Sequence, residues 1–496
     1  MPTSPASPPP PSAPSLPPPP GPLFLAGLGG IGMSALAQLL RWQGYTVAGS
    51  DRETAGPGRD ELYAKLRAQG ITIWPQDGSG VRAVRPALLI YSTALEEDNP
   101  DFAAAAELGG AREHRARALA AALNRLPGRQ IAVAGSAGKT SVTAWLASTL
   151  RHLGLPTLCV GGGYSHEACD DRHPGNFSAD PNPEWLVAEV DESDGSLTAF
   201  TPDYGVLLNV GTDHFSRDHL LELFQRFLRG CREGAVFPAS LAHELQLPPD
   251  LPAFQFQPAG NPPPGNAPET VVTPEHYHPG PDGCDFSVAG LGRCQVRQYG
   301  RHSAANAAAV IATLRLLGLP PHPEAWRNAL GAFRGVARRF DRAGTTATGL
   351  PVYDDYAHNV EKIGAAIATA QDAHPDRGLL ILFQPHGFGP FKFMRDALLD
   401  TLRRQLRPAD RFALLPVYYA GGTSSFTPTA REVADGYRAA GLDVLDFLDK
   451  PQAARFIADG ANGAAAILVL GARDPALPAW CRSLCGVHDS SIGVSW

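Results

Sequence analysis

The sequence has no long hydrophobic run and no excess of positive charge. None of its apolar stretches approaches the roughly 20 residues that a helix needs to cross a bilayer, so we expect no membrane-spanning segment and no membrane partner. Lys and Arg number 42 against 49 Asp and Glu, which gives a formal net charge of −7. This balance disfavours nucleic acid as a partner.

Cysteine is scarce and unpatterned. The seven cysteines are an odd number at scattered positions without a CxxC motif, which favours reduced thiols over a disulfide framework. The first 22 residues are mainly Pro and Ser and lack the basic and apolar parts of an export signal. We therefore expect a disordered tail over residues 1–22 and a cytoplasmic protein.

What the sequence does contain is an alternation of short apolar runs with helical stretches. This alternation predicts parallel α/β sheets, and 496 residues with 44% hydrophobic side chains can form several buried cores. We predict an α/β protein of three domains: a Rossmann-like domain over 23–115, a central P-loop domain over 116–342 and a second Rossmann-like domain over 343–496. A Pro-rich stretch at 248–283 is predicted to be a surface loop.

A glycine-rich turn follows the first apolar run. Gly27, Gly29 and Gly32 fit G-x-G-x-x-G between a strand and a helix, and Asp51 ends the next strand. This pattern is typical of a nicotinamide dinucleotide site. However, glycines that let the backbone approach a pyrophosphate suit any diphosphate ligand, including a nucleotide sugar. The turn alone leaves both alternatives open.

A second phosphate-binding motif lies in "IAVAGSAGKTSVTAW" at residues 131–145, which predicts a strand, a tight loop and a helix. Amides of the loop would cradle phosphate oxygens, Lys139 would reach the β- and γ-phosphates, and Thr140 or Ser141 would offer a hydroxyl to Mg²⁺. Val133 replaces the first glycine of the strict motif. We predict ATP binding here, and we expect an exposed loop lysine at 139 to add little to stability.

Acidic and polar side chains follow the next two predicted strands. "EVDESDGS" begins with Glu189, and "NVGTDH" contains Asn209, Asp213 and His214. The carboxyl ends of parallel strands meet at one edge of a sheet, and carboxylate oxygens are preferred ligands of Mg²⁺. The sequence therefore predicts a metal site beside the P-loop, with His214 as a candidate ligand.

Six motifs occur in the order seen in the Mur ligases, ATP-dependent amide-forming enzymes of peptidoglycan synthesis: "GSAGKTS", "EVDESDGS", "NVGTDH", "RHSAANAAAV", "GVARRFD" and "DDYAH". The chain resembles this family from about residue 23 to its end, and "GLGGIGMSALA" and "FQPH" are most similar to its alanine-adding branch. The resemblance implies that the glycine turn holds a UDP-sugar, UDP-N-acetylmuramate. ATP would phosphorylate the carboxylate of this sugar, and an amino acid bound by the C-terminal domain would attack the acyl phosphate.

The resemblance also implies roles for particular residues. ATP and Mg²⁺ would be held by Gly135, Gly138, Lys139, Thr140, Ser141, Glu189, His214, Asn306, Arg339 and Asp355. Of these, Thr140, Glu189 and His214 would bind metal, and Lys139, His214, Arg339 and Asp355 would be catalytic. The two other substrates would contact Gly29, Gly30, Ile31, Ser34, Asp51, Ser92, Tyr356, His358 and His386. The C-terminal domain would close over ATP and exclude water from the acyl phosphate.

The chain departs from the family pattern mainly on the amino-acid side of the site. Gly387 and Pro390 stand where alanine-adding ligases carry arginines, and Arg473 stands where glycine is usual. Ala137 and Ser303 also differ from the pattern. The acceptor is therefore open among L-alanine, glycine, serine and, for a recycling ligase, a preformed peptide. An NAD-dependent oxidoreductase and a non-catalytic relative are the remaining alternatives, and we expect a monomer or homodimer.

Overall fold

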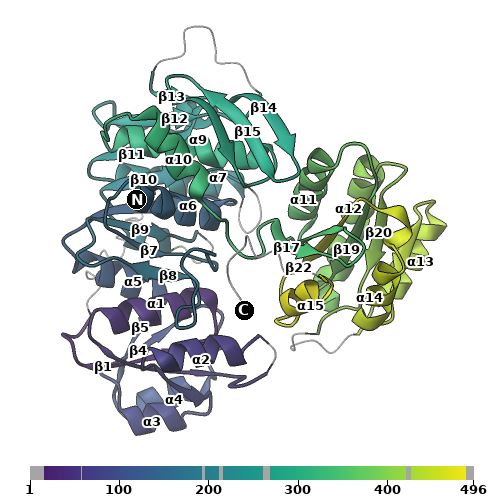
Figure 1. Ribbon diagram of the computed structural model, residues 1–496. Coiled ribbons are helices and arrows are strands. Elements are labelled where there is room, and N and C mark those ends of the chain that lie inside the picture. Colours follow the sequence, from purple (N-terminus) through teal and green to yellow (C-terminus); the bar gives the residue numbers. More distant parts are fainter. Residues whose placement is uncertain are drawn as a thin grey trace, which may run out of the picture.

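The computed structural model describes residues 16–56, 58–192, 196–211, 216–260, 269–419 and 426–486, and the structural statements below refer to these residues. Three α/β units are visible in Figure 1. The N-terminal unit lies below the central one, and the C-terminal unit stands beside both. The predicted class, an α/β protein of three domains, is confirmed.

The N-terminal sheet is parallel, with strand order β3-β2-β1-β4-β5. Its elements are β1 (Pro22–Ala26), α1 (Ile31–Trp42), β2 (Thr46–Asp51), α2 (Asp60–Ala68), β3 (Thr72–Pro75), α3 (Ser79–Val84), β4 (Leu88–Tyr91), α4 (Pro100–Glu107) and β5 (Ala111–His114). Leu23 to Ala26 are fully buried, as expected for a strand covered by helices on both faces. Strands β2 and β3 are added on one side of β1, and β4 and β5 on the other, so the glycine turn after β1 lies at the switch in strand order where such sheets bind ligands.

The predicted disordered tail is too long. Leu16 is 5% exposed and belongs to the hydrophobic core. The carbonyl oxygen of Pro17 accepts hydrogen bonds from Tyr45 Oη at 2.7 Å and Arg125 Nη1 at 3.0 Å. These contacts fix the chain before β1, so the tail does not extend to residue 22. Residues 1–15 lie outside the described part of the chain.

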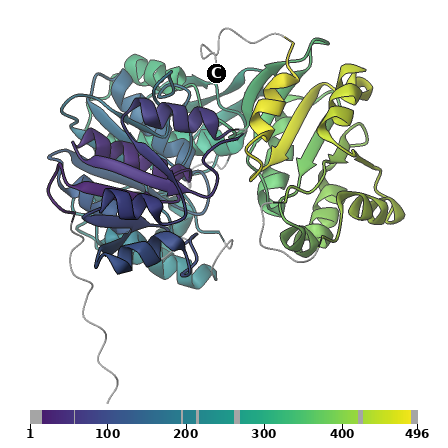
Figure 2. The same ribbon diagram turned by 90° about the horizontal axis from the view of Figure 1, so that it is seen from below.

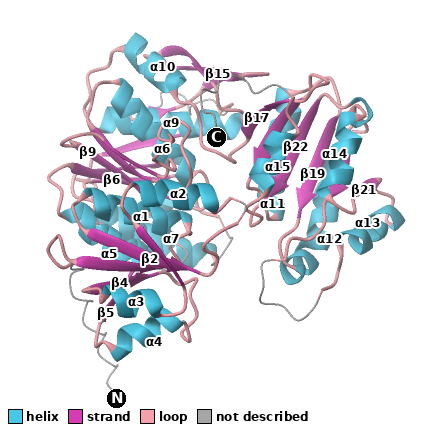
Figure 3. Cartoon of the chain, turned by 60° about the horizontal axis from the view of Figure 1, so that its bottom comes forward, coloured by secondary structure: helices cyan, strands magenta, loops and turns pink. Residues whose placement is uncertain are grey.

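The central sheet has the order β13-β12-β11-β10-β6-β9-β7-β8 and is parallel except for β8. Its elements are α5 (Arg115–Asn124), β6 (Arg129–Ala134), α6 (Lys139–His152), β7 (Thr157–Val160), β8 (Phe177–Ala179), β9 (Trp185–Glu189), η1 (Ser196–Ala199), β10 (Tyr204–Leu207), α7 (Arg217–Arg229), β11 (Gly234–Pro238), η2 (Ala239–Leu241), α8 (Ala242–Leu245), β12 (Ala253–Phe256), β13 (Val271–Val272), α9 (Arg301–Leu316) and α10 (Pro323–Ala332). Helices α1, α5 and α7 lie between this sheet and the N-terminal one (Figure 3), and a single hydrophobic core joins the two units.

The prediction of a surface loop at 248–283 is wrong for the parts of that stretch that form strands. It contains β12, β13, β14 (Glu275–Gly280) and the start of β15 (Gly283–Val288), which pairs with β16 (Gly292–Val296) in a small antiparallel sheet. Phe256 and Val272 are buried at the edge of the central sheet. Proline is tolerated in such edge strands because they need not donate every backbone hydrogen bond. Residues 261–268 lie outside the described chain.

The C-terminal sheet has the order β17-β18-β22-β19-β20-β21, with only β17 antiparallel. Its elements are β17 (Asp341–Thr345), β18 (Pro351–Asp355), α11 (Val360–Ala373), β19 (Leu379–Gln384), α12 (Phe388–Gln405), β20 (Arg411–Leu414), α13 (Ala430–Ala439), β21 (Val444–Asp446), α14 (Lys450–Ala458), η3 (Ala461–Gly463), β22 (Ala466–Gly471) and α15 (Leu477–Ser483). Helices α11 to α13 form one core with this sheet and α14 and α15 form another, on its two faces. Figure 2 shows this unit as a separate body beside the others.

The predicted domain limits do not coincide with element limits. The limit after residue 115 falls at the first residue of α5, and the limit after residue 342 falls inside β17. Within the described residues, no helix has the length and apolarity required to traverse a bilayer. All seven cysteines are free, and no cluster of three metal-ligating side chains is found among the residues described.

An ion pair joins the central unit to the start of the C-terminal sheet, and it should make the stability of the protein depend on pH. His166 Nε2 lies 2.9 Å from Asp341 Oδ1. Burial lowers the pKa of His166, but the charge of Asp341 and its hydrogen bond raise that pKa further, so it lies above its ordinary value. The folded protein therefore holds this proton more tightly than the unfolded chain, whose histidine titrates near pH 6.5.

The stabilisation by this pair is complete below about pH 6.5 and is lost as the pH rises through the folded pKa. We expect the melting temperature to fall more steeply above pH 6.5 in the wild type than in His166→Gln, as measured by differential scanning calorimetry. His173→Gln, which changes a surface histidine paired with Asp170, serves as the control. Equal slopes for wild type and His166→Gln would contradict this role.

Candidate active site

The loop between β6 and α6 has the backbone of a phosphate-binding loop. Gly135 and Gly138 have φ values of 134° and 84°, which only glycine adopts without strain. Asn209, just after β10, accepts a hydrogen bond from the amide of Ala137 at 2.8 Å and donates one to its carbonyl oxygen at 2.9 Å. The apex of the loop is thus held from the neighbouring strand end, beside the amides at the N-terminus of α6.

Lys139 is not the exposed lysine that the sequence predicts. Its side chain is 13% exposed, and Nζ lies 2.7 Å from Glu192 Oε2 and 3.6 Å from Asp191 Oδ1. Burial lowers the pKa of Lys139, but these carboxylates raise it more, so the lysine is charged. The acids reach it because β9 neighbours β6 in the sheet. A bound phosphate would compete with Glu192 for this ammonium group.

Thr140 and Glu189 form a pair of oxygen donors next to the loop. Thr140 Oγ1 donates to Glu189 Oε1 at 3.2 Å, and Glu189 Oε2 accepts the amide of Gly162 at 2.7 Å. A Cβ on Gly162 would lie 2.5 Å from Glu189 Oε1, so only glycine allows this approach. A hydroxyl and a carboxylate are suitable ligands for Mg²⁺. The third predicted ligand, His214, lies outside the described residues, as does Asp213.

The two arginines before β17 take different places. Arg338 is bound within the C-terminal unit: its Nε lies 3.2 Å from Asp354 Oδ2, and its guanidinium donates to the carbonyl oxygens of Gly471 and Ala472. Arg339 instead reaches the central unit, where Nη2 lies 3.5 Å from Thr140 Oγ1. The structure therefore brings Arg339 to the phosphate-binding loop and leaves Arg338 in a structural position.

Asp355 holds the segment between the two units. Its carboxylate accepts the amides of Phe340 at 2.7 Å and Ala357 at 2.8 Å, and burial raises its pKa. The predicted contact of Asp355 with nucleotide stays a prediction. Asn306 of α9 lies against the loop, since a Cβ on Gly138 would be 3.0 Å from Asn306 Oδ1.

Ser141, a predicted nucleotide contact, and Ser303, which departs from the family pattern, both lie on helices of the central unit. Ser141 is half-buried in the first turn of α6. Ser303 is 5% exposed, and its hydroxyl donates to the carbonyl oxygen of Tyr299 at 2.7 Å. The Ser303 hydroxyl is therefore bound to the backbone just before α9.

The glycine turn after β1 is bound to Asp51 rather than open to it. The amide of Gly29 donates to Asp51 Oδ2 at 2.7 Å, and Arg59 Nη1 donates to the carbonyl oxygen of Gly29 at 2.7 Å. A Cβ on Gly29 would lie 2.5 Å from Tyr63 Oη. Asp51 is 8% exposed and already paired, which is unlike a carboxylate presented to the ribose of a dinucleotide.

The other residues predicted for the UDP-sugar lie around the start of α1 and the end of β4. Gly30 is exposed, and Ile31 and Ser92 are half-buried. Ser34 is fully buried; its hydroxyl donates to the carbonyl oxygen of Gly30 at 3.0 Å and accepts from Asn176 Nδ2 at 2.9 Å. This geometry gives Ser34 a role in joining α1 to the central unit, and a direct substrate contact stays a prediction.

Two arginines near the glycine turn were missed by sequence reasoning. Arg115 begins α5, and its Nη1 would lie 2.7 Å from a Cβ on Gly32, so its guanidinium lies at the N-terminus of α1. Sequence reasoning predicted no strand before "EHRAR", so it gave no signal for Arg115. Arg59 gave no signal either, because its importance depends on its contact with the glycine turn, 30 residues earlier in the chain. Burial raises the pKa of Tyr164 to about 12 and also raises the pKa of Tyr418, and the positive charge of Arg59 lowers both values in part.

The predicted acceptor-side residues form a continuous row at the edge of the C-terminal sheet. The ring of Tyr356 lies 5.5 Å from that of His358, which lies 5.4 Å from that of His386. The guanidinium of Arg339 lies 5.5 Å from the Tyr356 ring, so the row begins at the P-loop. Burial lowers the pKa of His386 to about 4, with the charges of His358 and Arg473 acting in the same direction. His386 is therefore neutral at pH 7.

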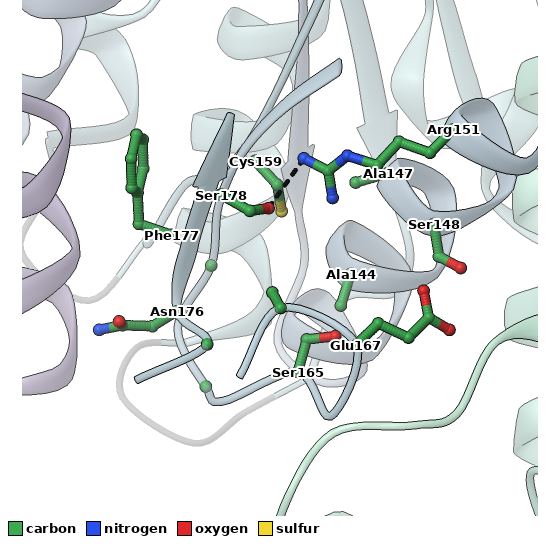
Figure 4. A pocket seen from close by; sticks show the side chains of 14 residues that line it. Ala144, Ala147, Ser148, Arg151, Cys159, Ser165, Glu167, Asn176, Phe177 and Ser178 are labelled. Atoms are coloured by element: carbon green, nitrogen blue, oxygen red, sulfur yellow. Dashed lines mark hydrogen bonds between the residues drawn. The ribbon is translucent and has the colours of Figure 1, made fainter. Parts of the chain in front are cut away.

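A small pocket behind the P-loop is separate from this site. It is lined by one face of α6, from Ala144 to Arg151, by Cys159 of β7, by alternate residues from Gly161 to Glu167 with Ala168, and by residues 175–178. Its charged groups are already paired, since Arg151 binds Asp180 at 3.0 Å and Ser178 at 2.8 Å, and Glu167 accepts the amide of Arg334 at 2.8 Å. Figure 4 shows Arg151 directed at Ser178. We assign this pocket no chemistry.

Comparison with known proteins identifies the class. Models of the Mur ligase family match the chain over residues 25–126 (catalytic domain), 133–232 (middle domain) and 338–473 (glutamate ligase domain). Curated UDP-N-acetylmuramate–L-alanine ligases from Streptomyces coelicolor and Acidithiobacillus ferrooxidans are each 33% identical to it, over 90% and 91% of this chain and 94% of theirs. The chain belongs to the Mur ligase family.

Solved structures are similar over the same extent. The UDP-N-acetylmuramate–alanine ligase of Thermotoga maritima superposes with a TM-score of 0.75 and 26% identity, covering 94% of this chain and 98% of that one. A murein peptide ligase from Psychrobacter arcticus has a TM-score of 0.64 and 20% identity over 94% and 98% of the two chains. At that identity the second similarity shows the fold alone.

The pairing of Lys139 with Glu192 should contribute to stability, and the ammonium group of Lys139 should also bind nucleotide. Lys139→Met removes the ammonium group that would bind phosphate and leaves a buried carboxylate without its partner, which costs about 1–3 kcal/mol. Lys139→Met/Glu192→Gln recovers most of that stability but not nucleotide binding. Urea unfolding measures the first effect and the ATP-induced thermal shift the second. Normal ATP binding by the double variant would show that Lys139 does not contact the nucleotide.

Proposed function

We propose that the protein is an ATP-dependent ligase that joins L-alanine to the carboxylate of UDP-N-acetylmuramate. The curated relatives carry the name of this reaction. The observation that carries the proposal is the contact of Arg339 with Thr140, because it brings the phosphate-binding loop next to the Tyr356–His358–His386 row. A phosphorylated carboxylate formed at the loop would then lie beside the place where an amine can enter.

The chemistry follows from the poor reactivity of a carboxylate. Transfer of the γ-phosphate of ATP to a carboxylate oxygen creates an acyl phosphate, and the amine attacks its carbonyl carbon to give a tetrahedral intermediate. Collapse expels phosphate and leaves the amide and ADP. Lys139 and Arg339 place positive charge where two anions must meet. Mg²⁺ held by Thr140 and Glu189 would further neutralise the phosphate oxygens.

We also propose that the C-terminal unit closes over the loop during the reaction. The N-terminal and C-terminal units already touch, since a Cβ on Gly58 would lie 2.4 Å from the carbonyl oxygen of Pro475. Closure would exclude water, which otherwise hydrolyses an acyl phosphate. A cytoplasmic location and a monomeric or homodimeric state stay predictions.

The third prediction tests the reaction. We expect ADP release to require UDP-N-acetylmuramate and L-alanine together, with a new amide detected by mass spectrometry. Glycine, L-serine and an L-alanine-initiated tripeptide form parallel arms, which separate a biosynthetic from a recycling ligase. No ADP release with any of these acceptors would reject the ligase function, and preference for the tripeptide would reject L-alanine as the substrate.

The fourth prediction concerns the metal. EDTA should abolish ADP release and Mg²⁺ should restore it. Glu189→Gln keeps the shape of the side chain but loses its charge, so we expect the Mg²⁺ concentration for half-maximal rate to rise at least about tenfold. Glu184→Gln changes an exposed acid just before the same strand, β9, and should leave it unchanged. Identical Mg²⁺ titrations for both variants would exclude Glu189 as a ligand.

A further inference from the structure

Arg473 leaves the C-terminal sheet beside the acceptor-side row. Strand β22 lies between β18 and β19, and Leu470 pairs with Asp355 and Gly471 with Gln384. The segments that follow these three parallel strands therefore emerge side by side. They carry Arg473, Tyr356 with His358, and His386.

The guanidinium of Arg473 is available for a ligand. Arg473 is exposed and has neither a hydrogen bond nor an ion pair with any part of the chain that the structure describes. The adjacent Asp474 does not neutralise it, because its Oδ2 lies 2.5 Å from Lys450 Nζ and its Oδ1 accepts the amide of Ala476 at 2.8 Å. An arginine left unpaired next to a functional row is a candidate binding group for an anion.

The neighbouring His386 points to the same place. Its Nδ1 is buried and has no hydrogen-bond partner within the described residues, so it can serve a ligand at this edge. The charge of Arg473 acts on this imidazole, whose pKa is about 4 chiefly because of burial. A neutral imidazole next to a guanidinium can contact a carboxylate and an amine without adding a second positive charge.

We infer that Arg473 binds the α-carboxylate of the acceptor amino acid and is a specificity-determining residue of the ligase. This inference rests on the proposed function. The reaction contains a second carboxylate, that of the UDP-sugar, but phosphorylation requires that group to lie by Lys139 and Thr140. Arg473 lies at the other end of the row, with His386. The start of α12 offers no arginine there, since Gly387, Phe388, Gly389 and Pro390 precede an exposed Lys392.

A guanidinium fork gives the site a preference that a single ammonium group would not. It binds both oxygens of a carboxylate in one plane. Acceptors with a free α-carboxylate next to the amine should therefore be favoured over α-amides. They should also be favoured over peptides, in which the carboxylate lies one or more residues away from the reacting amine.

The experiment compares Arg473→Gln and Arg473→Lys with the wild type, varying L-alanine, UDP-N-acetylmuramate and ATP in turn. For Arg473→Gln we expect the KM for L-alanine to rise at least tenfold, and the KM values of the other two substrates to change less than twofold. The KM for L-alanine of Arg473→Lys should lie between those of the wild type and Arg473→Gln. L-Alaninamide should be a poor acceptor for the wild type and no worse for Arg473→Gln. Arg377→Gln, an exposed arginine before β19 at the opposite edge of the sheet, is the matched control.

An unchanged KM for L-alanine in Arg473→Gln overturns the inference, and so does a rise confined to UDP-N-acetylmuramate, which would assign Arg473 to the other carboxylate. Exchange of labelled ADP into ATP, dependent on UDP-N-acetylmuramate and without amino acid, separates this failure from that of the proposed function. The exchange should persist in Arg473→Gln. Its absence in the wild type, together with absent amide formation, rejects the ligase function and the inference with it.

Discussion

The placement of Arg339 against Thr140 is the interaction on which the arrangement of the site depends. Arg338 and Phe340, on either side of Arg339, have φ values of 62° and 48°, a strained conformation for residues other than glycine. The strain persists because the segment is held from several directions. Asp355 accepts the amide of Phe340, and the amide of Tyr356 donates to the carbonyl oxygen of Arg338 at 2.9 Å.

The interface between the N-terminal and central units differs in kind from the interface of the C-terminal unit. The N-terminal and central units share one hydrophobic core, to which Leu36 of α1, Leu119 of α5 and Phe224 of α7 all belong. The C-terminal unit has two cores of its own, one of which also includes Tyr299 of the central unit, and it meets the central unit through that aromatic contact and polar pairs such as His166 with Asp341. Relative motion at such a small interface costs less than motion that opens a shared hydrophobic core, so the proposed closure is expected at residues 338–341.

Two buried carboxylates, those of Glu192 and Asp51, lie where anionic substrates would bind. Lys139 is satisfied by Glu192, and the amide of Gly29 by Asp51. In both places a carboxylate of the protein stands where a phosphate group is proposed to bind. Such internal partners satisfy groups that would otherwise be buried without a hydrogen bond, and binding would proceed by exchange of one anion for another.

The sequence by itself determined the chemistry that depends on adjacent residues. The phosphate-binding loop, the acids at strand ends and the motif order predicted the α/β class, the family and ATP use, because each requires particular residues within a few positions. The resemblance also implied that Arg339 helps to hold ATP, and the structure brings Arg339 to the loop. The alternation of short apolar runs with helical stretches predicted parallel sheets for the same local reason.

Only the tertiary structure decided features that join distant residues. The burial of Lys139 against Glu192, the docking of Leu16, and the strands within the Pro-rich stretch all depend on neighbours supplied by the sheet. Arg59 and Arg115 gained significance only from the glycine turn that they approach. The sequence marked Arg473 as a departure, but its place beside His386 follows from the pairing of β19 with β22, because strand order is a long-range property that no local pattern encodes.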